Sequence, residues 1–359
     1  MSRLKIGVVG VGIGRIHLEA YRTLTDSVEI VAACDLNENR LNQIADEYNI
    51  PLRYNDYLAL FSSGQIEAVS ICLPTSLHAP VSIAALEAGL HVLCEKPLAE
   101  NTQMGQKIVE AAAKAPGKFM ICFNRRYRPD VQWIKALIDE GGLGQIYQIK
   151  TGWVRETGIP GWTAWFTDKQ IAGGGPLIDL GVHMLEAAMW LLNYPRPQTV
   201  SGDVRANFGQ HGRKTWLRPG DADIRHAFNV EDSATAFIRL EGDISLNLEA
   251  SWASHTKPGK DDFFMTVMGT EGTVELYVPN YATEDTLKLY TELGGRPVTI
   301  QPHVSRSRTD HGYAITEFVK CIQQDLPPTA SAEDGLTISK MIDAIYKSSD
   351  LKREVLISD

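Results

Sequence analysis

The amino-acid sequence predicts an α/β protein with two domains: a parallel sheet covered by helices, then an α/β domain with a mostly antiparallel sheet. Over the first 124 residues, short apolar runs alternate with amphipathic helical patterns, as is typical of parallel strands joined by helical crossovers. From residue 125 on, alternating apolar and polar residues recur in runs separated by short turns, which favours antiparallel pairing. The length of 359 residues allows a core in each part. We therefore expect domains at 1–124 and 125–359.

The individual elements follow from hydrophobic periodicity, which changes between the two domains. In the first domain, strands are expected at 4–9, 28–34, 68–73, 91–94 and 119–123. Helices are expected there at about 41–48, 81–88 and 102–114. In the second domain, strands are expected at 145–153, 233–240, 244–252, 263–268, 273–278 and 286–290. Helices are expected there at 130–140, 176–192, 312–324 and 332–348. The polar stretch at 208–228 has no regular pattern and is interpreted as a lid, an oligomer contact or neither.

Composition excludes several classes of protein. A net charge of −9 offers no general attraction for nucleic acid or for an anionic membrane. The longest apolar stretch, at 176–192, carries three ionisable residues and is therefore not a membrane span. Met1 leads directly into a strand without the pattern of a signal peptide. We therefore expect a cytoplasmic protein without nucleic-acid or membrane partners.

The cysteines show neither a disulfide pattern nor a metal-binding pattern. Their number is odd and they are widely spaced, which argues against a disulfide framework or a zinc site. The first four lie within or at the end of apolar runs, where a free thiol packs as a small hydrophobic group. No metal is therefore predicted. The five residues are Cys34, Cys72, Cys94, Cys122 and Cys321.

A glycine-rich turn, Gly10-Val-Gly-Ile-Gly14, connects the first expected strand to a helix. In such turns, backbone N–H groups and the helix N-terminus hold a pyrophosphate. The third glycine comes one residue earlier than in the usual G-x-G-x-x-G spacing, so the motif alone is a weak indication. Asp35 ends the second strand, 23 residues after Gly12, where a carboxylate hydrogen-bonds a ribose 2′-hydroxyl. Because the same charge repels a 2′-phosphate, the sequence favours NAD over NADP.

Polar residues follow the later strands of the parallel sheet, at the edge where ligands bind in such folds. They occur in three runs, which are 74–78, 95–97 and 124–127. Lys96 is the most informative of them, because a lysine over a cofactor crevice can donate to a substrate oxygen. A solvated surface lysine is the competing interpretation.

The expected helix at 176–192 is apolar on nearly every side except for three ionisable residues. Asp179, His183 and Glu186 have the spacing i, i+4 and i+7, so they share one face. Three successive glycines at 173–175 allow backbone or a ligand to approach the start of the helix closely. We interpret Asp179 and His183 as an acid/base pair, and a hydrogen-bonded structural pair is the alternative.

Aromatic and charged residues around 158–161 are candidates for a polyol pocket. Trp153, Arg155 and Trp162 combine aromatic faces with charged donors, a combination that suits hydroxyl-rich rings. The same residues are equally suited to a core or an interface.

The glycine turn, Asp35, Glu95-Lys96-Pro97 and the segment from Asp179 to His183 together resemble the Gfo/Idh/MocA family. That family includes glucose–fructose oxidoreductase and inositol dehydrogenase, and the resemblance covers essentially the whole chain. It implies an N-terminal Rossmann domain and a C-terminal α/β domain whose open sheet often forms an oligomer interface. It also implies hydride transfer between a nicotinamide and a hydroxyl carbon of a sugar or cyclitol.

Carried over residue by residue, the resemblance implies that His183 is the base, that Asp179 supports it and that Lys96 hydrogen-bonds the reacting oxygen. The residues it implies along the dinucleotide are Gly10, Gly12, Ile13, Gly14, Asp35, Pro74, Thr75, His78, Glu95 and Lys96. The substrate contacts expected from the resemblance and the pocket residues are Lys96, Arg126, Trp153, Arg155, Trp162, Asp179 and His183. The sequence departs from the family pattern at the early Gly14 and at Glu186, where many members have aspartate.

Three functions remain open at this point. The first is an NAD-dependent sugar or cyclitol dehydrogenase. The second is a glycoside-processing enzyme that oxidises and re-reduces its sugar with bound NAD. The third is a regulator that binds the dinucleotide as a signal, and the presence of Lys96, Asp179 and His183 together argues against it. A half-buried antiparallel sheet commonly pairs with a partner, so a homodimer or homotetramer is expected.

Overall fold

The computed structural model describes residues 3–160, 165–214 and 228–357. The chain folds into two compact units. The first contains residues 1–124 and 308–339, and the second contains 125–307 and 340–359. The expected division placed all of 125–359 in the second domain, whereas 308–339 returns to the first unit. It does so because helix α9 (Asp310–Gln323) packs against helix α1 (Gly14–Tyr21).

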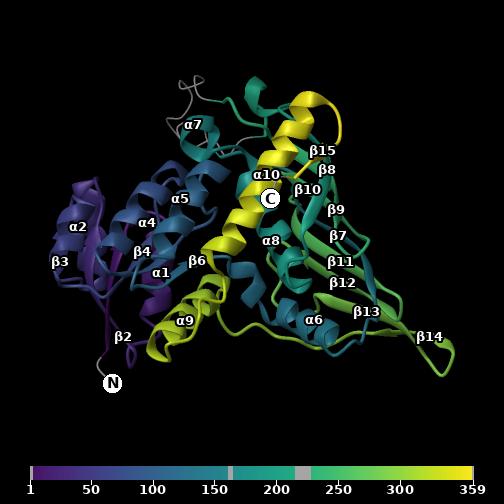
Figure 1. The fold of residues 1–359 in the computed structure, drawn as a ribbon, viewed down its shortest axis with the longest axis horizontal. Coiled ribbons are helices and arrows are strands. Elements are labelled where there is room, and N and C mark those ends of the chain that lie inside the picture. The colour runs from purple at the N-terminus through teal and green to yellow at the C-terminus, as the bar shows by residue number, and fades with distance from the viewer. Residues whose placement is uncertain (1–2, 161–164, 215–227, 358–359) are drawn as a thin grey trace. The chain divides into compact units, whose positions relative to one another are not determined.

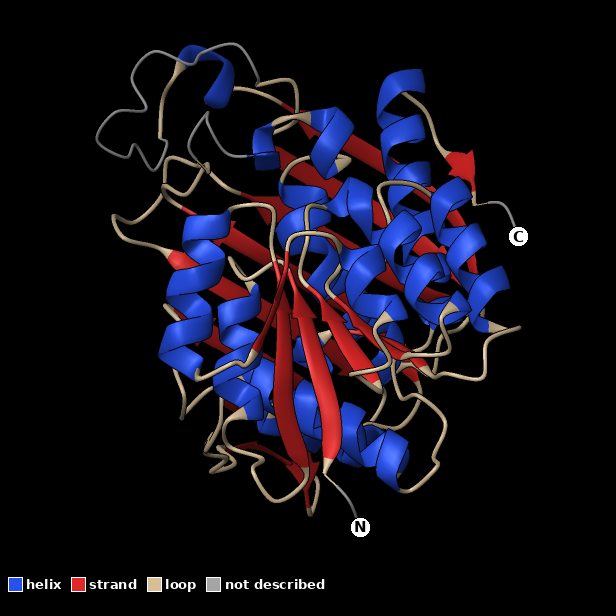
Figure 2. Cartoon of the chain, turned by 90° about the vertical axis from the view of Figure 1, so that its left-hand side faces the viewer, coloured by secondary structure: helices blue, strands red, loops and turns tan. Residues whose placement is uncertain are grey.

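The first unit is built on a six-stranded, wholly parallel sheet in the order β3-β2-β1-β4-β5-β6 (Figure 1). Its strands are β1 (Leu4–Val9), β2 (Val28–Cys34), β3 (Leu52–Tyr54), β4 (Ala68–Ile71), β5 (His91–Cys94) and β6 (Phe119–Ile121). The helices between them are α1, α2 (Glu38–Tyr48), α3 (Tyr57–Ser62), α4 (His78–Glu87) and α5 (Thr102–Ala112). This strand order is that of the doubly wound dinucleotide-binding fold, so the expected parallel α/β domain is confirmed. Figure 2 shows strands of this sheet with helices on either side.

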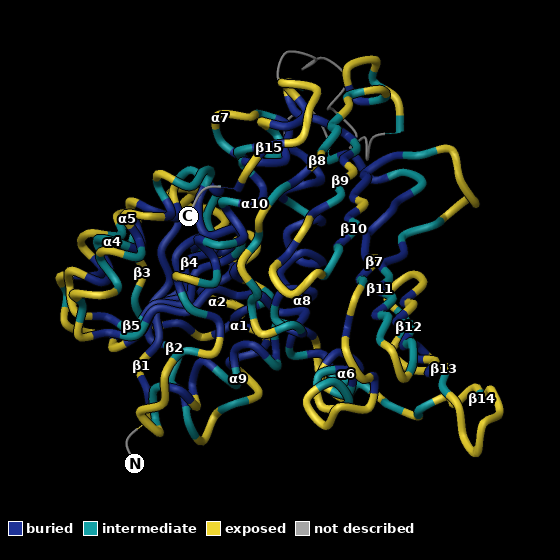
Figure 3. Tube along the Cα trace, turned by 45° about the vertical axis from the view of Figure 1, so that its right-hand side comes forward, coloured by how far each residue is buried: buried dark blue, intermediate teal, exposed yellow. Residues whose placement is uncertain are grey.

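The core of the first unit follows from the apolar patterns. Every residue of β4 is buried, as expected for a central strand covered on both faces. In α2 the buried residues are those with the spacing 0, 3, 4, 7, namely Leu41, Ile44, Ala45 and Tyr48. Figure 3 shows the traces of β1, β4 and β5 as mostly buried. Strand β3 was not predicted, because three residues, none of them buried, carry too little periodicity.

The second unit is built on a nine-stranded sheet in the order β14-β13-β12-β11-β7-β10-β9-β8-β15. Strands β7 and β10 pair in parallel, and every other neighbouring pair is antiparallel. The strands are β7 (Ile146–Arg155), β8 (Pro197–Arg205), β9 (Ser233–Leu240), β10 (Ile244–Ser251), β11 (Asp261–Gly269), β12 (Gly272–Pro279), β13 (Leu287–Leu293), β14 (Arg296–Ile300) and β15 (Val355–Leu356). The expected mostly antiparallel sheet is therefore confirmed. Strands β8, β14 and β15 were missed, because they are edge or near-edge strands with mainly polar or very short sequences.

One face of the second sheet is covered by helices. Helix α8 (Val182–Leu191) packs on β7 and β11, and α6 (Pro129–Asp139) packs on α8 and β12. Along β9 and β12 buried residues alternate with less buried ones, as a sheet with one covered face requires. On the other face Tyr277, one of the less buried residues of β12, is 50% exposed.

The remaining elements connect or extend the two units. Short helical segments are present at η1 (Thr75–Leu77), η2 (Asn124–Tyr127), η3 (Trp165–Thr167), α7 (Lys169–Ala172) and η5 (Gly209–His211). Helix α10 (Ala332–Leu351) begins in the first unit and ends in the second. Residues 215–227 of the expected irregular stretch lie outside the described residues. No helix within the described ranges combines the length and the apolar character needed to cross a bilayer.

Candidate active site

The three glycines of the turn after β1 have different structural roles. Gly10 has φ +87°, and a Cβ there would overlap the carbonyl of Cys72, so the tight turn requires glycine. A Cβ on Gly14 would meet Val8 at 2.8 Å, so this glycine allows α1 to pack closely on β1. At Gly12 an added Cβ meets no described atom within 4 Å, which leaves the backbone open to a ligand. The early position of Gly14 therefore still provides the close helix–strand packing of the usual third glycine.

The N-terminus of α1 has the features of an anion-binding position. Its N-cap residue is Ile13, whose side chain makes no capping hydrogen bond and is 45% exposed. The first N–H groups of a helix carry partial positive charge. In α1 those of Gly14 and Ile16 donate to the carbonyls of Gly10 at 3.1 Å and Ile13 at 3.0 Å. With the open position at Gly12, this end of the helix fits a pyrophosphate.

Asp35 lies at the end of β2, as the sequence predicted, and its carboxylate is buried. It accepts hydrogen bonds from the backbone N–H of Val11 at 3.0 Å and of Asn37 at 2.8 Å. Arg40 adds a bidentate contact, with Nε at 3.0 Å and Nη2 at 2.7 Å from the two carboxylate oxygens. The side chain of Arg40 is itself 49% exposed. The Arg40 guanidinium therefore lies next to the Asp35 carboxylate, whereas the prediction from the sequence assumed a negative charge without a neighbouring cation.

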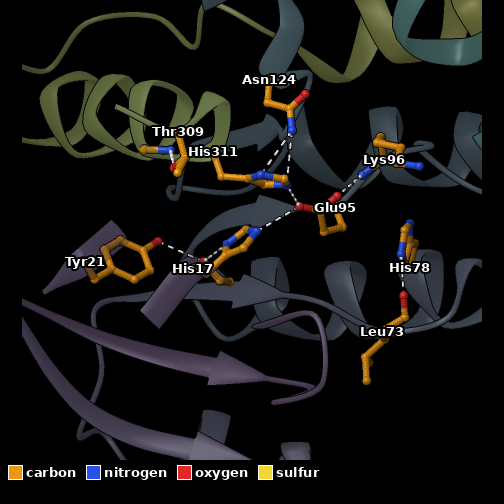
Figure 4. A network of polar contacts seen from close by, with 11 residues as sticks. His17, Tyr21, Leu73, His78, Glu95, Lys96, Asn124, Thr309 and His311 are labelled. Carbon is orange, nitrogen blue, oxygen red and sulfur yellow. Dashed lines mark hydrogen bonds and ion pairs between the residues drawn. The ribbon is translucent and has the colours of Figure 1, made fainter. Parts of the chain in front are cut away.

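His78 and Thr75 follow β4 and are buried inside the unit. The His78 ring lies between two backbone carbonyls, with Nδ1 2.7 Å from Pro97 O and Nε2 2.9 Å from Leu73 O (Figure 4). Burial lowers the pKa of His78, although both carbonyls act to raise it. A neutral ring donates to only one of them. His78 thus ties the loop after β4 to the loop after β5 that contains Lys96.

The side chain of Glu95 points into the interior of the first unit. Its Oε1 lies 2.8 Å from His17 Nε2 and 3.3 Å from His311 Nε2, and its Oε2 accepts from the Lys96 backbone N–H at 3.2 Å. Burial acts to raise the pKa of Glu95, but the hydrogen bonds from the two histidines outweigh it and hold the pKa well below its ordinary value. The carboxylate of the Glu95-Lys96-Pro97 triplet is therefore part of a buried polar network (Figure 4).

In the second unit, the segment with the expected acid/base pair begins as a π-helix, η4 (Leu177–Gly181), and continues as α8. Glu231 binds at its start, where one carboxylate oxygen accepts from Gly175 N at 2.9 Å, Leu177 N at 3.1 Å and the Tyr346 hydroxyl at 2.9 Å. A Cβ on Gly174 would overlap the Tyr346 hydroxyl, and one on Gly175 would overlap the Glu231 carbonyl. The absence of side chains at Gly174 and Gly175 therefore allows Tyr346 and Glu231 to contact the start of the helix.

His183 and Asp179 have well-defined surroundings within the second unit. The His183 side chain is buried, and its ring centroid is 5.9 Å from that of Trp153 at an interplanar angle of 45°. Asp179 Oδ2 accepts a hydrogen bond of 2.9 Å from Trp252 Nε1. The π-helical turn adds a residue to the helical repeat just before His183, a feature frequent at functional sites.

Charged side chains gather around Trp153. Arg155 Nε lies 3.1 Å from Asp261 Oδ1, which also accepts from Trp153 Nε1 at 2.7 Å. The guanidinium of Arg125 is 4.6 Å from the Trp153 ring centroid and that of Arg155 is 5.3 Å away. Burial acts to lower the pKa of Arg155, but the charges of Asp179 and Asp261 outweigh it and raise the pKa. Trp153 and Arg155 thus lie near His183 and Asp179 within the second unit.

Arg126 has different surroundings from those implied for a substrate contact. Its side chain is 1% exposed, and Nε donates to Glu186 Oε1 at 2.6 Å. Nη2 contacts the same carboxylate oxygen and lies 2.5 Å from the Tyr194 hydroxyl. Arg126 and Glu186 therefore form a buried ion pair, and the neighbouring Arg125 is the arginine beside Trp153.

The structure brings together only some of the predicted site residues within each unit. The glycine turn and Asp35 meet at the ends of β1 and β2, and His183, Asp179, Trp153 and Arg155 gather around one ring cluster. Trp162 lies outside the described residues. Trp252, Glu231 and Asp261 were not predictable from the sequence, because a lone tryptophan or acidic residue in a strand region carries no positional signal.

The fold and these residues define a dinucleotide-binding Rossmann domain joined to a second domain with a buried histidine. A family model described as an oxidoreductase family with an NAD-binding Rossmann fold matches residues 4–123, and the GFO/IDH/MocA C-terminal domain matches residues 131–275. The chain therefore belongs to the Gfo/Idh/MocA oxidoreductase family.

Curated relatives match over nearly the whole chain. D-glucoside 3-dehydrogenase of Escherichia coli K12 is 29% identical over 97% of this chain and 96% of that protein. Myo-inositol 2-dehydrogenase of Thermotoga maritima is 25% identical over 99% of each. Among solved structures, levoglucosan dehydrogenase in complex with NADH and levoglucosan has a TM-score of 0.87 at 22% identity, covering all of both chains. This last similarity shows the shared fold.

Proposed function

We propose that this protein is a dehydrogenase that transfers hydride between NAD and a secondary hydroxyl carbon of a sugar or cyclitol, with His183 as the acid/base. The observation that carries the proposal is the position of His183 beside Trp153, with Asp179 one turn earlier on the same helical segment. The whole-length relatives named for glucoside and inositol dehydrogenation support the substrate class.

In this reaction His183 removes the hydroxyl proton, a step for which a neutral imidazole is suited near pH 7. Asp179 favours the imidazolium that results and is itself held by the indole N–H of Trp252. Lys96 donates a hydrogen bond to the reacting oxygen and stabilises its developing negative charge. The nicotinamide, when bound, supplies the hydride acceptor.

The residues of the first unit fit a dinucleotide. Gly12 leaves the backbone open, α1 presents its N-terminal N–H groups, and Asp35 ends β2. We propose that Gly10, Gly12, Ile13 and Gly14 hold the pyrophosphate. Asp35 would accept from the ribose of NAD, although Arg40 must share this carboxylate.

The other proposed cofactor contacts act mainly through backbone. Pro74 and Thr75 follow β4, and Lys96 follows β5, at the ligand-binding edge of the parallel sheet. The buried side chains of His78 and Glu95 hold these two loops in shape. We therefore assign His78 and Glu95 to positioning the cofactor loops.

Substrate recognition is proposed at Trp153, Arg155 and Arg125. The face of Trp153 offers an apolar platform for a sugar ring, and the two guanidinium groups beside it offer donors to ring hydroxyls. Arg126 is assigned to its ion pair with Glu186 rather than to the substrate.

The test is a panel of glucosides, free aldoses, myo-inositol and levoglucosan, with NADH formation followed by absorbance. We expect net NADH formation on at least one of them. For that substrate, His183→Ala should lower kcat by about 10²–10⁴. Asp179→Asn should cause a smaller loss, because the amide oxygen still accepts from Trp252. The control is His303→Ala, an exposed histidine of the same unit, which should behave like the parent.

Three results contradict the proposal. A folded His183→Ala variant within threefold of the parent would exclude His183 as the base. Glycoside turnover without net NADH would show transient oxidation instead. NAD binding with no turnover on any polyol or sugar would favour a regulator.

A further inference from the structure

Four side chains with metal-binding atoms converge inside the first unit, outside the pyrophosphate turn. They are His17, Glu95, Cys122 and His311, and one ligand atom of each lies within 4.8 Å of all the others. His17, Glu95 and Cys122 are almost completely buried, and the His311 side chain is 22% exposed. Figure 4 shows His17 and His311 both directed at the Glu95 carboxylate. The proposed hydride transfer uses Glu95 through its contact with the Lys96 backbone and gives no role to His17, Cys122 or His311.

The residues around the cluster form a second layer of the kind that orients metal ligands. His17 Nε2 faces Glu95, and its Nδ1 lies 3.1 Å from Ser70 Oγ. Ser70 Oγ in turn lies 2.8 Å from the Tyr21 hydroxyl. Because a hydroxyl can donate or accept, Ser70 and Tyr21 suit either tautomer of His17. The tautomer with Nε2 free to bind a metal is therefore available without any rearrangement of the fold.

Asn124 completes the second layer on the other side. Its Nδ2 lies 3.3 Å from His311 Nδ1 and 3.1 Å from His311 Nε2, and its Oδ1 is buried without a hydrogen-bond partner among the described residues. A His311 ring that binds a metal through Nε2 carries its proton on Nδ1 and needs an acceptor there. Turning the Asn124 amide by 180° places Oδ1 at that position, where it can accept from the Nδ1–H of His311. The amide nitrogen then takes the buried position that Oδ1 occupies now.

We propose that His17, Glu95, Cys122 and His311 bind one divalent transition-metal ion, with zinc favoured by this mixed set of ligands. Two imidazoles, a thiolate and a carboxylate are all zinc ligands, and four of them complete a tetrahedral site. Zinc bonds of about 2.0–2.3 Å separate tetrahedral ligand atoms by roughly 3.3–3.8 Å. The present separations of 2.8 Å and 3.3 Å between Glu95 and the histidines need only a small opening.

Charge and protons balance in such a site. Glu95 contributes one negative charge, and the Cys122 thiol loses its proton to solvent when its sulfur binds the metal. Two anionic and two neutral ligands then neutralise a divalent ion. Because all four positions belong to the protein, no position remains for a reacting water, which is the arrangement of a structural site.

The proposed ion would join segments that are far apart in the sequence. His17 comes from α1, Glu95 follows β5, Cys122 follows β6 and His311 lies in the first turn of α9. Metal binding would thus fasten the returning segment 308–339 to the sheet of the first unit. The sequence predicted no zinc site from its widely spaced cysteines. Only one of the four proposed ligands is a cysteine, so the spacing of the cysteines does not indicate this site.

The experiment begins with the purified full chain, stripped with a chelator and dialysed. Added Zn²⁺ should bind with a stoichiometry of about one per chain and raise Tm by at least about 5 °C. Co²⁺ in place of zinc should give a thiolate-to-cobalt charge-transfer band in the near ultraviolet, which reports directly on Cys122. Cys122→Ser should abolish that band, and His311→Gln should weaken zinc binding at least tenfold.

The control is Cys94→Ser, which removes a neighbouring buried thiol outside the four-ligand set and should keep both the cobalt band and the zinc affinity. Because the readouts are metal content, spectra and Tm, the result is independent of the proposed dehydrogenase activity. Less than about 0.2 zinc per chain with no rise in Tm of the stripped parent would overturn the proposal. Zinc binding that survives Cys122→Ser unchanged, or a cobalt band lost in Cys94→Ser, would overturn it as well.

Discussion

The buried ion pair between Arg126 and Glu186 gives a test of whether Arg126 serves the fold or the substrate. The two side chains are 1% and 0% exposed, so both charges are fully withdrawn from water. Removing one partner of a buried pair leaves an uncompensated charge and costs about 3–5 kcal/mol of unfolding free energy. Arg126→Met should therefore destabilise the protein by roughly this amount. For a domain of this size that corresponds to a decrease in Tm of roughly 6–20 °C.

The double variant Arg126→Met with Glu186→Leu provides the matched comparison. Because it removes both charges together and fills the space with apolar atoms, it should recover most of the lost stability. Urea titration of the two single variants and the double variant measures the coupling. The KM of the Arg126→Met enzyme for its sugar should stay within about threefold of the parent. Arg125→Met should instead raise KM, since Arg125 lies over the Trp153 ring.

The opposite pattern would refute this reasoning. If Arg126→Met raised KM tenfold or more while urea titration showed unchanged stability, Arg126 would be a substrate residue. Additive effects in the double variant would likewise show that the two charges do not stabilise one another.

Three further predictions follow from individual contacts. Asp35→Ser should weaken the preference for NAD over NADP. Arg40→Ala should strengthen that preference, because Arg40 is the cation available to a 2′-phosphate. Tighter binding of NADP than of NAD by the parent protein in calorimetry would refute both expectations. Burial raises the pKa of Glu231, so the folded state holds its proton more tightly than the unfolded state does. Stability relative to a non-titrating Glu231→Gln variant should therefore decrease as pH rises above the ordinary value of 4.5, and a difference that is constant or increases with pH in urea titrations would contradict it. The exposed sheet face bearing Tyr277 should pair with a second copy, and sedimentation should show a homodimer or homotetramer rather than a monomer at micromolar concentration.

The sequence alone determined the features that repeat at short range. The parallel strands of the first unit, the face of α2 and the glycine turn follow from patterns within a few residues of one another. The same holds for strands β9 and β12, because their alternation of apolar and polar residues predicts that one face is covered. Asp35 at the end of β2 was predictable because its position relative to the turn is set by one strand and one helix.

Only the tertiary structure decided which distant residues meet. Asp179 binds Trp252, which is 73 positions later, and Arg126 binds Glu186 across 60 positions. No period in the sequence marks such pairs, since their contact depends on how whole elements pack. The position of residues 308–339 in the first unit has the same origin. The sequence of an amphipathic helix shows that one face is apolar, but it does not show which surface packs against that face. His17 and His311 meet at Glu95 for this reason, and neither was recognisable from its neighbours in the chain.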